Sequence, residues 1–176
     1  MKKITCEVRG ISGLLMNAFP MIPIENPPPE KRSPEEQADL KAYRDPDTGM
    51  LYIPGIAIQR AFIGAAAYSK GKGRASLQKQ AAASLFIFPE RVSLGVKKYV
   101  LDSRAVVIPA TRGRVIRHRP RLDEWKAKFE IEYDESLLTE RQVRQIVDDA
   151  GSRVGLLDFR PEKKGPFGRF IVTEWK

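Results

Sequence analysis

The sequence predicts an α+β protein whose core is a ferredoxin-like, RRM-like antiparallel sheet with the element order βαββαβ. Two segments, residues 2–9 and 126–133, alternate apolar and polar side chains as half-buried strands do. Two other segments carry apolar residues at helical spacing, and the second begins with a capping box. A glycine-rich stretch, residues 151–168, then leads directly into a last strand-like run, residues 170–175. Strands and helices in this order favour a sheet with its helices on one face.

The first strand is predicted over residues 2–9, with Ile4, Cys6 and Val8 on its buried face. An inserted region follows at about residues 17–53, and it opens with a proline-rich loop that cannot join a central strand. Ser33 and Glu36 form a capping box for a short helix that we expect to end near Tyr43. A turn and a short strand complete the insertion as a helix plus hairpin.

The first main helix is predicted from residue 56 to about residue 70, after Pro54 and Gly55. An alanine-rich helix at residues 74–84 and an apolar run at residues 85–88 follow. Residues 92–101 hold one or two short strands. The segments 102–108 and 114–118 are predicted to pair as a hairpin around a turn that contains Pro109 and Gly113.

The second main helix is predicted to begin at Thr139, which forms a capping box with Gln142. Gly151 supplies the expected stop of this helix, since glycine is the preferred residue just beyond a helix C-terminus. The whole chain, residues 1–176, is expected to fold as a single domain, because its length suits one core.

Composition restricts the class of protein. No apolar run approaches the roughly 18 residues that span a bilayer, and the N-terminus lacks the apolar segment of a secretory signal. A single cysteine, Cys6, excludes an internal disulfide framework and a zinc site built from cysteines. These features predict a cytoplasmic protein with no membrane association.

The net charge of +9 is concentrated in one part of the chain. Residues 97–121 contain eight basic and one acidic residue, whereas residues 122–150 contain four basic and nine acidic residues. A separation of this kind predicts a molecule with one cationic face, which suits an anionic partner such as a nucleic acid.

The strongest local signal lies at residues 112–121, where five arginines and the only histidine, His118, fall within ten residues. Arginine binds phosphate in a bidentate manner and stacks on bases, so such a row suits single-stranded RNA. The alternative interpretation is a solvated edge strand whose charges prevent aggregation. We favour nucleic-acid contact, because the excess charge extends over the whole segment 97–121.

The glycine-rich stretch combines Gly151, Gly155, Gly165 and Gly168 with nearby cations. Glycine lets a backbone approach a ligand closely, and cations on such a loop suit phosphates. The stretch precedes a strand, whereas the phosphate-binding loops of nucleotide enzymes precede a helix. We therefore expect a contact surface for a nucleic acid, and no nucleotide-binding enzyme.

Several short motifs resemble those of the RAMP superfamily of CRISPR-associated RNA-binding proteins. The strand KITCEVRG at residues 3–10 leads into an irregular loop, and YIPGIAIQRAF at residues 52–62 is similar to the family's "iPGSSLKGALR" segment. A helix is followed by the glycine-rich stretch, and GPFGRF at residues 165–170 stands in place of the family's G-x-G ending. The resemblance spans most of the chain and fits a divergent member, such as one carried by a virus or mobile element. It implies RNA binding through a basic sheet face and the glycine-rich loop, and some members also cleave RNA.

We therefore expect a single-stranded RNA-binding protein without a cofactor or metal ion, in a homo-oligomer or a ribonucleoprotein complex. The residues expected to contact phosphates are Arg60, Arg112, Arg114, Arg117, Arg119, Arg121, Arg160, Lys163, Lys164 and Arg169. One alternative is a metal-independent endoribonuclease in which His118 acts as general acid or base, assisted by Tyr99 or a lysine. Another is a phage-type structural or single-stranded DNA-binding protein, because nothing in the sequence reads a 2′-hydroxyl.

Two further features have plain structural interpretations. Asp45 and Asp47 could hold a divalent ion, but a turn with Pro46 and Gly49 is the favoured interpretation. Trp125 and Trp175 could stack on bases, but we expect both to belong to the core.

Overall fold

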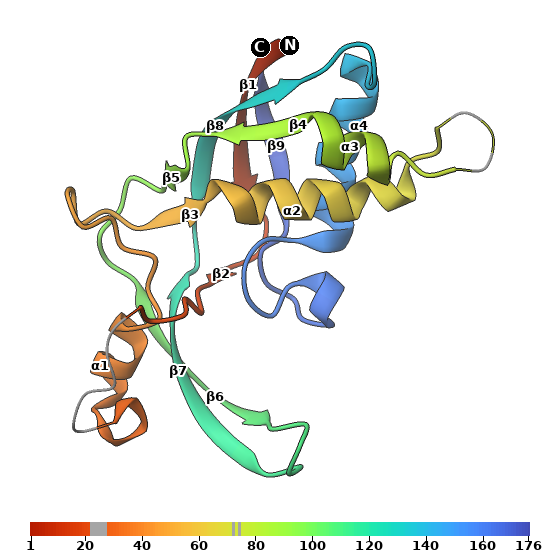
Figure 1. Cartoon of the computed structure of the whole chain (residues 1–176). Coiled ribbons are helices and arrows are strands. Elements are labelled where there is room, and N and C mark those ends of the chain that lie inside the picture. Colours follow the sequence, from red (N-terminus) through yellow and green to blue (C-terminus); the bar gives the residue numbers. More distant parts are fainter. Residues whose placement is uncertain (22–27, 72, 74) are drawn as a thin grey trace.

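The computed structural model describes the chain except residues 22–27, 72 and 74, and it has an α+β fold with antiparallel sheets (Figure 1). The central sheet consists of β1 (Lys2–Gly10), β4 (Leu85–Phe88), β8 (Lys126–Tyr133) and β9 (Phe170–Trp175). Its strand order is β4-β8-β1-β9, and every neighbouring pair is antiparallel. The predicted strands at residues 126–133 and 170–175 are confirmed at both ends.

One face of this sheet carries the core. Ile4, Cys6 and Val8 are buried as the alternating pattern predicts, and Ile4 and Cys6 lie opposite Ile131 and Phe129 in the register of β1 and β8. Burial raises the pKa of the Cys6 thiol to about 12, as expected for a cysteine that serves as a small buried hydrophobe.

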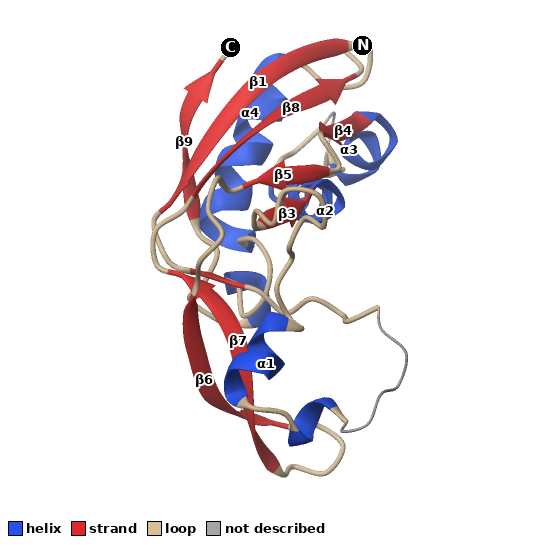
Figure 2. Ribbon diagram, turned by 90° about the vertical axis from the view of Figure 1, so that its left-hand side faces the viewer, coloured by secondary structure: helices blue, strands red, loops and turns tan. Residues whose placement is uncertain are grey.

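The helices α2 (Gly55–Ala65) and α4 (Glu140–Asp149) pack on this apolar face, and α3 (Gln78–Ser84) precedes β4 (Figures 1 and 2). The ring centroids of Phe62 in α2 and Phe129 in β8 are 6.0 Å apart. A 3-10 turn, Ala66–Tyr68, extends α2. Among the described residues, no helix is long and apolar enough to cross a membrane.

The capping box of Thr139 and Gln142 is confirmed, and α4 ends at Asp149, next to the predicted boundary, but Gly151 does not stop the helical segment. The chain continues in a π-helical turn, Ala150–Val154, and leaves it at Gly155, whose φ is +76°. Gly151 is needed for close packing instead, because a Cβ there would lie 2.2 Å from the carbonyl oxygen of Phe170 in β9.

The inserted region forms the short helix α1 (Pro34–Asp39) and strand β3 (Tyr52–Pro54), which pairs with β5 (Arg91–Ser93). The capping box of Ser33 and Glu36 is confirmed, but α1 ends four residues before the expected Tyr43. A 3-10 turn, Pro29–Lys31, precedes α1. Part of the proline-rich loop, residues 22–27, and the start of the predicted helix at residue 74 lie outside the described residues.

The predicted hairpin is confirmed as β6 (Val100–Val107) and β7 (Arg114–Leu122). It forms a separate sheet with β2 (Leu14–Leu15), in the order β2-β7-β6, and projects from the body of the protein as a curved ribbon (Figure 1). The most basic segment of the chain therefore stands outside the central sheet.

Candidate nucleic-acid interface

Successive side chains of a strand point to opposite faces, and this alternation assigns each arginine of the hairpin to one of its two faces. Arg114 lies opposite Val107, and Arg117 lies opposite Arg104, in the register of β6 and β7. Arg117 and Arg119 therefore share one face, and Arg114 points to the other. The helix α1 lies beside the hairpin and contacts both of its strands, while Arg114, Ile116 and Arg117 in β7 are exposed (Figure 2).

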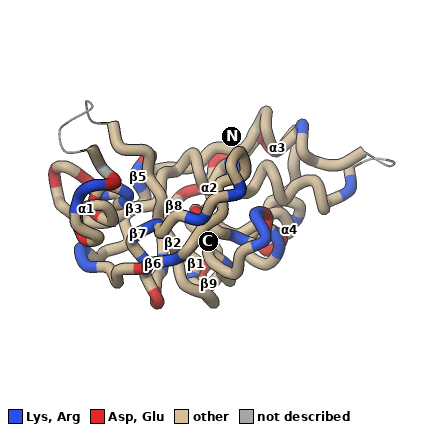
Figure 3. Tube along the Cα trace, turned by 90° about the horizontal axis from the view of Figure 1, so that it is seen from below, with Lys and Arg blue, Asp and Glu red and all other residues tan. Residues whose placement is uncertain are grey.

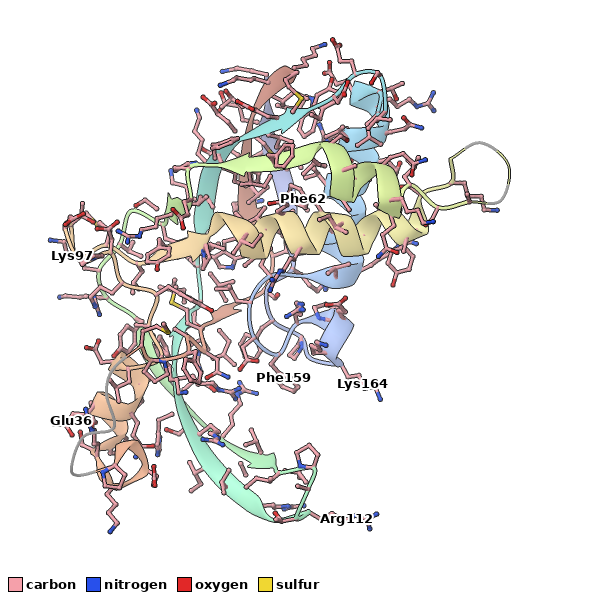
Figure 4. The ribbon with its side chains drawn as sticks, in the orientation of Figure 1. Glu36, Phe62, Lys97, Arg112, Phe159 and Lys164 are labelled. Atoms are coloured by element: carbon pink, nitrogen blue, oxygen red, sulfur yellow. The ribbon has the colours of Figure 1, made fainter. Side chains whose placement is uncertain are left out.

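Three of the predicted contact residues are free cations at the outer part of this ribbon. Arg112, Arg114 and Arg117 are exposed, and none has an ion pair or side-chain hydrogen bond with any described residue. Arg112 occupies the turn at the tip with a φ of +53° (Figure 4). These guanidinium groups are open to an incoming anion.

Two further predicted contact residues, Arg119 and Arg121, are engaged within the protein. Arg119 is only 6% exposed, and its Nη1 donates a hydrogen bond to Oδ2 of Asp158 at 2.5 Å. Arg121 donates from Nη1 to Asp102 at 3.0 Å and from Nε to Asp123 at 2.8 Å. Their positive charges are neutralised by carboxylates, so these two arginines support the structure of the hairpin base.

A second contact, which the sequence did not indicate, joins the hairpin to the glycine-rich stretch. The guanidinium carbon of Arg104 lies 4.8 Å from the ring centroid of Phe167, a cation–π geometry. Arg104 is also held by Asp102, with its Nε 2.9 Å from Oδ2. Together with the pair of Arg119 and Asp158, this stacking fixes the base of the ribbon against the loop. Arg104 and Phe167 are far apart in sequence, so no local pattern could have revealed their contact.

The glycines of the loop serve close packing of the chain on itself. A Cβ on Gly165 would lie 1.9 Å from the carbonyl oxygen of Phe159, and one on Gly168 would lie 2.0 Å from that of Leu156. Gly155 is buried, and so are the apolar residues that follow it, Leu156 and Leu157. The first part of the loop is therefore core, and the contact surface begins near Arg160.

The cations of the loop fall into two groups. Arg160 is half-buried and is held by Glu162, with Nη2 2.6 Å from Oε2, and by the carbonyl oxygen of Leu157. Lys163, Lys164 and Arg169 are exposed, and within the described chain their side chains have no hydrogen bond or ion pair. Figure 4 shows Lys164 at the lower edge of the loop, on the side where the hairpin projects.

A cleft of about 520 Å³ lies between the first turns of α2 and this loop. Arg60 from α2 lines it and is exposed and unpaired among the described residues. Lys163 lines the loop side of the cleft, and the paired residues Arg160 and Glu162 lie beside it. The cleft thus brings together two free cations that are about a hundred residues apart in sequence.

The open face of the central sheet has no excess of positive charge, in contrast to the basic sheet face that the resemblance implied. Lys3 lies opposite Glu132, and its Nζ is 2.7 Å from Oε1 of that residue. Lys128 pairs with Glu174 at 2.7 Å. The charged residues of this face balance, and they are Lys3, Arg9, Lys126, Lys128, Glu7, Glu130, Glu132 and Glu174. Two exposed aromatic residues, Phe86 and Phe88, border it on β4.

The free cations Arg112, Arg114 and Arg117 lie together on the hairpin, at one end of the molecule. Figure 3, which views that end from below, shows basic positions along the hairpin. Lys41 adds to this field, and its pKa is lowered first by burial and then by the nearby charge of Arg117. The carboxylate of Asp158 acts in the opposite direction and partly offsets this lowering of the pKa.

His118 has a simple environment. Its Nδ1 and the Ser103 hydroxyl are 2.8 Å apart, within hydrogen-bond distance. Tyr99, the proposed assistant in RNA cleavage, donates its hydroxyl to Asp39 at 3.3 Å instead. In the described part of the chain no other side chain forms a hydrogen bond or ion pair with His118. The geometry therefore provides no acid–base pair around this imidazole.

The remaining predictions concern metal binding and the tryptophans. Oδ1 of Asp45 accepts hydrogen bonds from the backbone amides of Asp47 and Thr48, which is the favoured turn interpretation. No group of three or more metal-binding side chains occurs among the described residues. Trp125 is buried and donates to the carbonyl oxygen of Ser12. Trp175 is half-buried, and Arg144 lies over its ring at 5.2 Å from the centroid.

Comparison with protein-family models and with curated protein sequences finds no match to this chain.

Proposed function

We propose that this chain is a RAMP-type protein with a ferredoxin-like core that binds single-stranded RNA through its hairpin and the α2–loop cleft. The separation of its cations into two classes carries this proposal. Arg119 and Arg121 at the hairpin base, and Lys3 and Lys128 on the sheet face, have carboxylate partners. The clustered arginines Arg112, Arg114 and Arg117 have none within the described residues. Unpaired, clustered arginines repel one another and so destabilise the folded chain, and their presence therefore favours an anionic ligand.

The strand order of the central sheet supports the ferredoxin-like part of the proposal. The sheet strands occur along the chain in the order β1, β4, β8 and β9, and they lie side by side as β4-β8-β1-β9. When the short helices α1 and α3 and the strands outside the central sheet are set aside, α2 separates β1 from β4. In the same way, α4 separates β8 from β9. This is the order that a βαββαβ unit with all-antiparallel neighbours requires.

The chemistry of the hairpin favours an unpaired strand over a duplex. Ile116 and Val107 are 63% and 57% exposed, beside the free arginines. Guanidinium planes can stack on the bases of single-stranded RNA, and aliphatic side chains can make apolar contacts with them, whereas the base faces of a duplex are not accessible. The mixture of exposed apolar and cationic groups on one ribbon thus fits bases as well as phosphates.

The test is the affinity for fluorescent single-stranded RNA at several salt concentrations. The triple variant Arg112→Gln, Arg114→Gln, Arg117→Gln is expected to bind about tenfold more weakly, with a salt slope reduced by about 0.7 for each lost contact. A matched control removes three exposed cations elsewhere, with Arg9→Gln, Lys79→Gln and Lys126→Gln. Its affinity is expected to change little, although its net charge falls equally.

The proposal is wrong if the wild-type protein binds no RNA at about 50 mM salt, where phosphate contacts are strongest. Equal losses in the variant and in the control would show that net charge, and not the hairpin, determines the affinity. Parallel titrations with single-stranded DNA of the same sequence distinguish the two ligands, since a preference for RNA requires contacts to the 2′-hydroxyl.

A further inference from the structure

A second pocket lies at the other end of α2 from the cleft. Its volume is about 380 Å³, and the 3-10 turn after α2 and the outer face of α4 form its walls. Lys70, Arg141 and Arg153 contribute three positive charges to its lining, and Asp149 contributes one negative charge. The side-chain amides of Gln142 and Gln145 also line it. A cationic pocket with amide donors has the composition of an anion site.

One of its arginines is held in position before any ligand arrives. The guanidinium of Arg153 lies 4.9 Å from the ring centroid of Tyr68, and its Nε is 3.4 Å from Oδ1 of Asp149. Asp149 in turn accepts a hydrogen bond from Nε2 of Gln145 at 3.3 Å. An arginine that is already ordered loses less conformational entropy when it binds a phosphate. The pair also explains why an acidic residue is tolerated near the C-terminus of α4, where the helix dipole disfavours it.

Other groups of the pocket have free hydrogen-bonding capacity. Lys70 and Arg141 are exposed, and neither has an ion pair or side-chain hydrogen bond with another described residue. The hydroxyl of Ser69, a residue that is only 9% exposed and lines the pocket, has no hydrogen-bond partner. A buried hydroxyl without a partner loses free energy, and a ligand oxygen could compensate for it.

The helix α2 relates this pocket to the cleft. Arg60 lines the cleft and Tyr68 lines the pocket, eight residues farther along the same helical segment. At about 1.5 Å per residue this separation is about 12 Å along the helix axis. At about 3.4 Å per nucleotide, the axial rise of one strand in a stacked DNA helix, about four nucleotides would bridge the two sites.

We propose that the pocket formed by Ser69, Lys70, Arg141 and Arg153 binds a phosphate of the same RNA strand, about four nucleotides beyond the α2–loop cleft. This inference rests on the proposed function and extends it, because it sets a minimum length for the bound strand. The binding track then runs from the hairpin, across the cleft and along α2 to the outer face of α4. Sequence patterns did not indicate it, since its cations are scattered over residues 70–153.

The experiment measures affinity for oligouridylates of increasing length with the wild-type chain and the variant Lys70→Gln, Arg141→Gln. These substitutions leave the pair of Arg153 and Asp149 intact. The wild-type affinity is expected to rise with length until the strand reaches the pocket. The variant is expected to stop gaining affinity about four nucleotides earlier, and to bind the longest RNA about tenfold more weakly with a salt slope lower by about 1.4. The control Arg9→Gln, Lys126→Gln removes the same charge from the sheet face and is expected to follow the wild type.

The outcomes distinguish a failure of this inference from a failure of the proposed function. If the wild type binds RNA and the variant follows it at every length, the pocket is not part of the track and the proposed function stands. If the wild type binds no RNA of any length, both proposals fall. If light scattering shows that the variant loses self-association in the absence of RNA, the pocket holds a carboxylate of another copy, and the inference of a phosphate site is overturned.

Discussion

Arg117 and Arg119 occupy successive positions on the same face of β7, yet only Arg119 is buried and paired. The sequence presents both as members of one arginine row, and the period of two correctly places them on a common face. Their distance from the base of the hairpin determines their roles, because the base contacts the glycine-rich loop and the outer part does not. That contact depends on Asp158, whose position opposite Arg119 arises only from the tertiary fold.

The different roles of these two positions predict mutational effects on stability of very different size. Asp158→Ala leaves the buried guanidinium of Arg119 without its carboxylate, and we expect it to lower the free energy of unfolding by about 3 kcal/mol. The estimate lies at the lower end of the range for buried pairs, because the Asp158 side chain is 30% exposed. Arg117→Gln, at an exposed and unpaired position, is expected to change stability by less than about 0.5 kcal/mol. Urea unfolding followed by circular dichroism measures both, and similar losses for the two variants would contradict the assignment.

At the scale of elements, local signals identified most of the secondary structure. The capping boxes at Ser33 and Thr139 mark helix starts correctly, because the hydrogen bonds that form them join residues three apart. Helix ends were less predictable. Gly151 lies in the π-helical turn after α4 and packs against β9, and a contact between residues 151 and 170 leaves no local signature.

The glycine-rich loop illustrates the same limit. Its glycines suggested a backbone that approaches a ligand, and the structure shows a backbone that approaches itself. Both interpretations require the same residue, since each needs a missing Cβ. The sequence therefore located an unusual loop and the free cations Lys163, Lys164 and Arg169, but it could not distinguish packing from binding.

A comparison of two glycines tests this interpretation of the loop. Gly168 and Gly95 both have positive φ, +76° and +70°, but a Cβ on Gly168 meets the Leu156 carbonyl at 2.0 Å, while one on Gly95 meets nothing within 4 Å. Gly95→Ala is expected to cost about 1–2 kcal/mol of stability, the backbone penalty alone. Gly168→Ala adds a clash with backbone and is expected to cost more than about 3 kcal/mol. Equal changes in thermal unfolding would indicate that the loop can move away from the added methyl group.

At the scale of the whole molecule, the sequence indicated the α+β class and the concentration of positive charge at residues 97–121. It did not indicate that the hairpin leaves the central sheet, because pairing between distant strands is set by the tertiary fold. It also could not indicate that the open sheet face is neutral. The cross-strand pairs of Lys3 with Glu132 and Lys128 with Glu174 appear only once the register is known.

This distribution of charge predicts where RNA protects the protein. With RNA at about one hundred times its dissociation constant, binding is expected to add about 2.7 kcal/mol to the free energy of unfolding, by mass action. Hydrogen exchange that proceeds through global unfolding slows equally everywhere, so the informative amides are those that exchange by local opening. We expect RNA to slow the exchange of such amides in residues 97–121 and 160–169. We expect no change for the amides of exposed residues in β1 and β8. Hydrogen-exchange mass spectrometry with and without RNA measures this exchange. Protection confined to β4 and β8, beside the exposed rings of Phe86 and Phe88, would instead place the RNA on the sheet and contradict the hairpin interface.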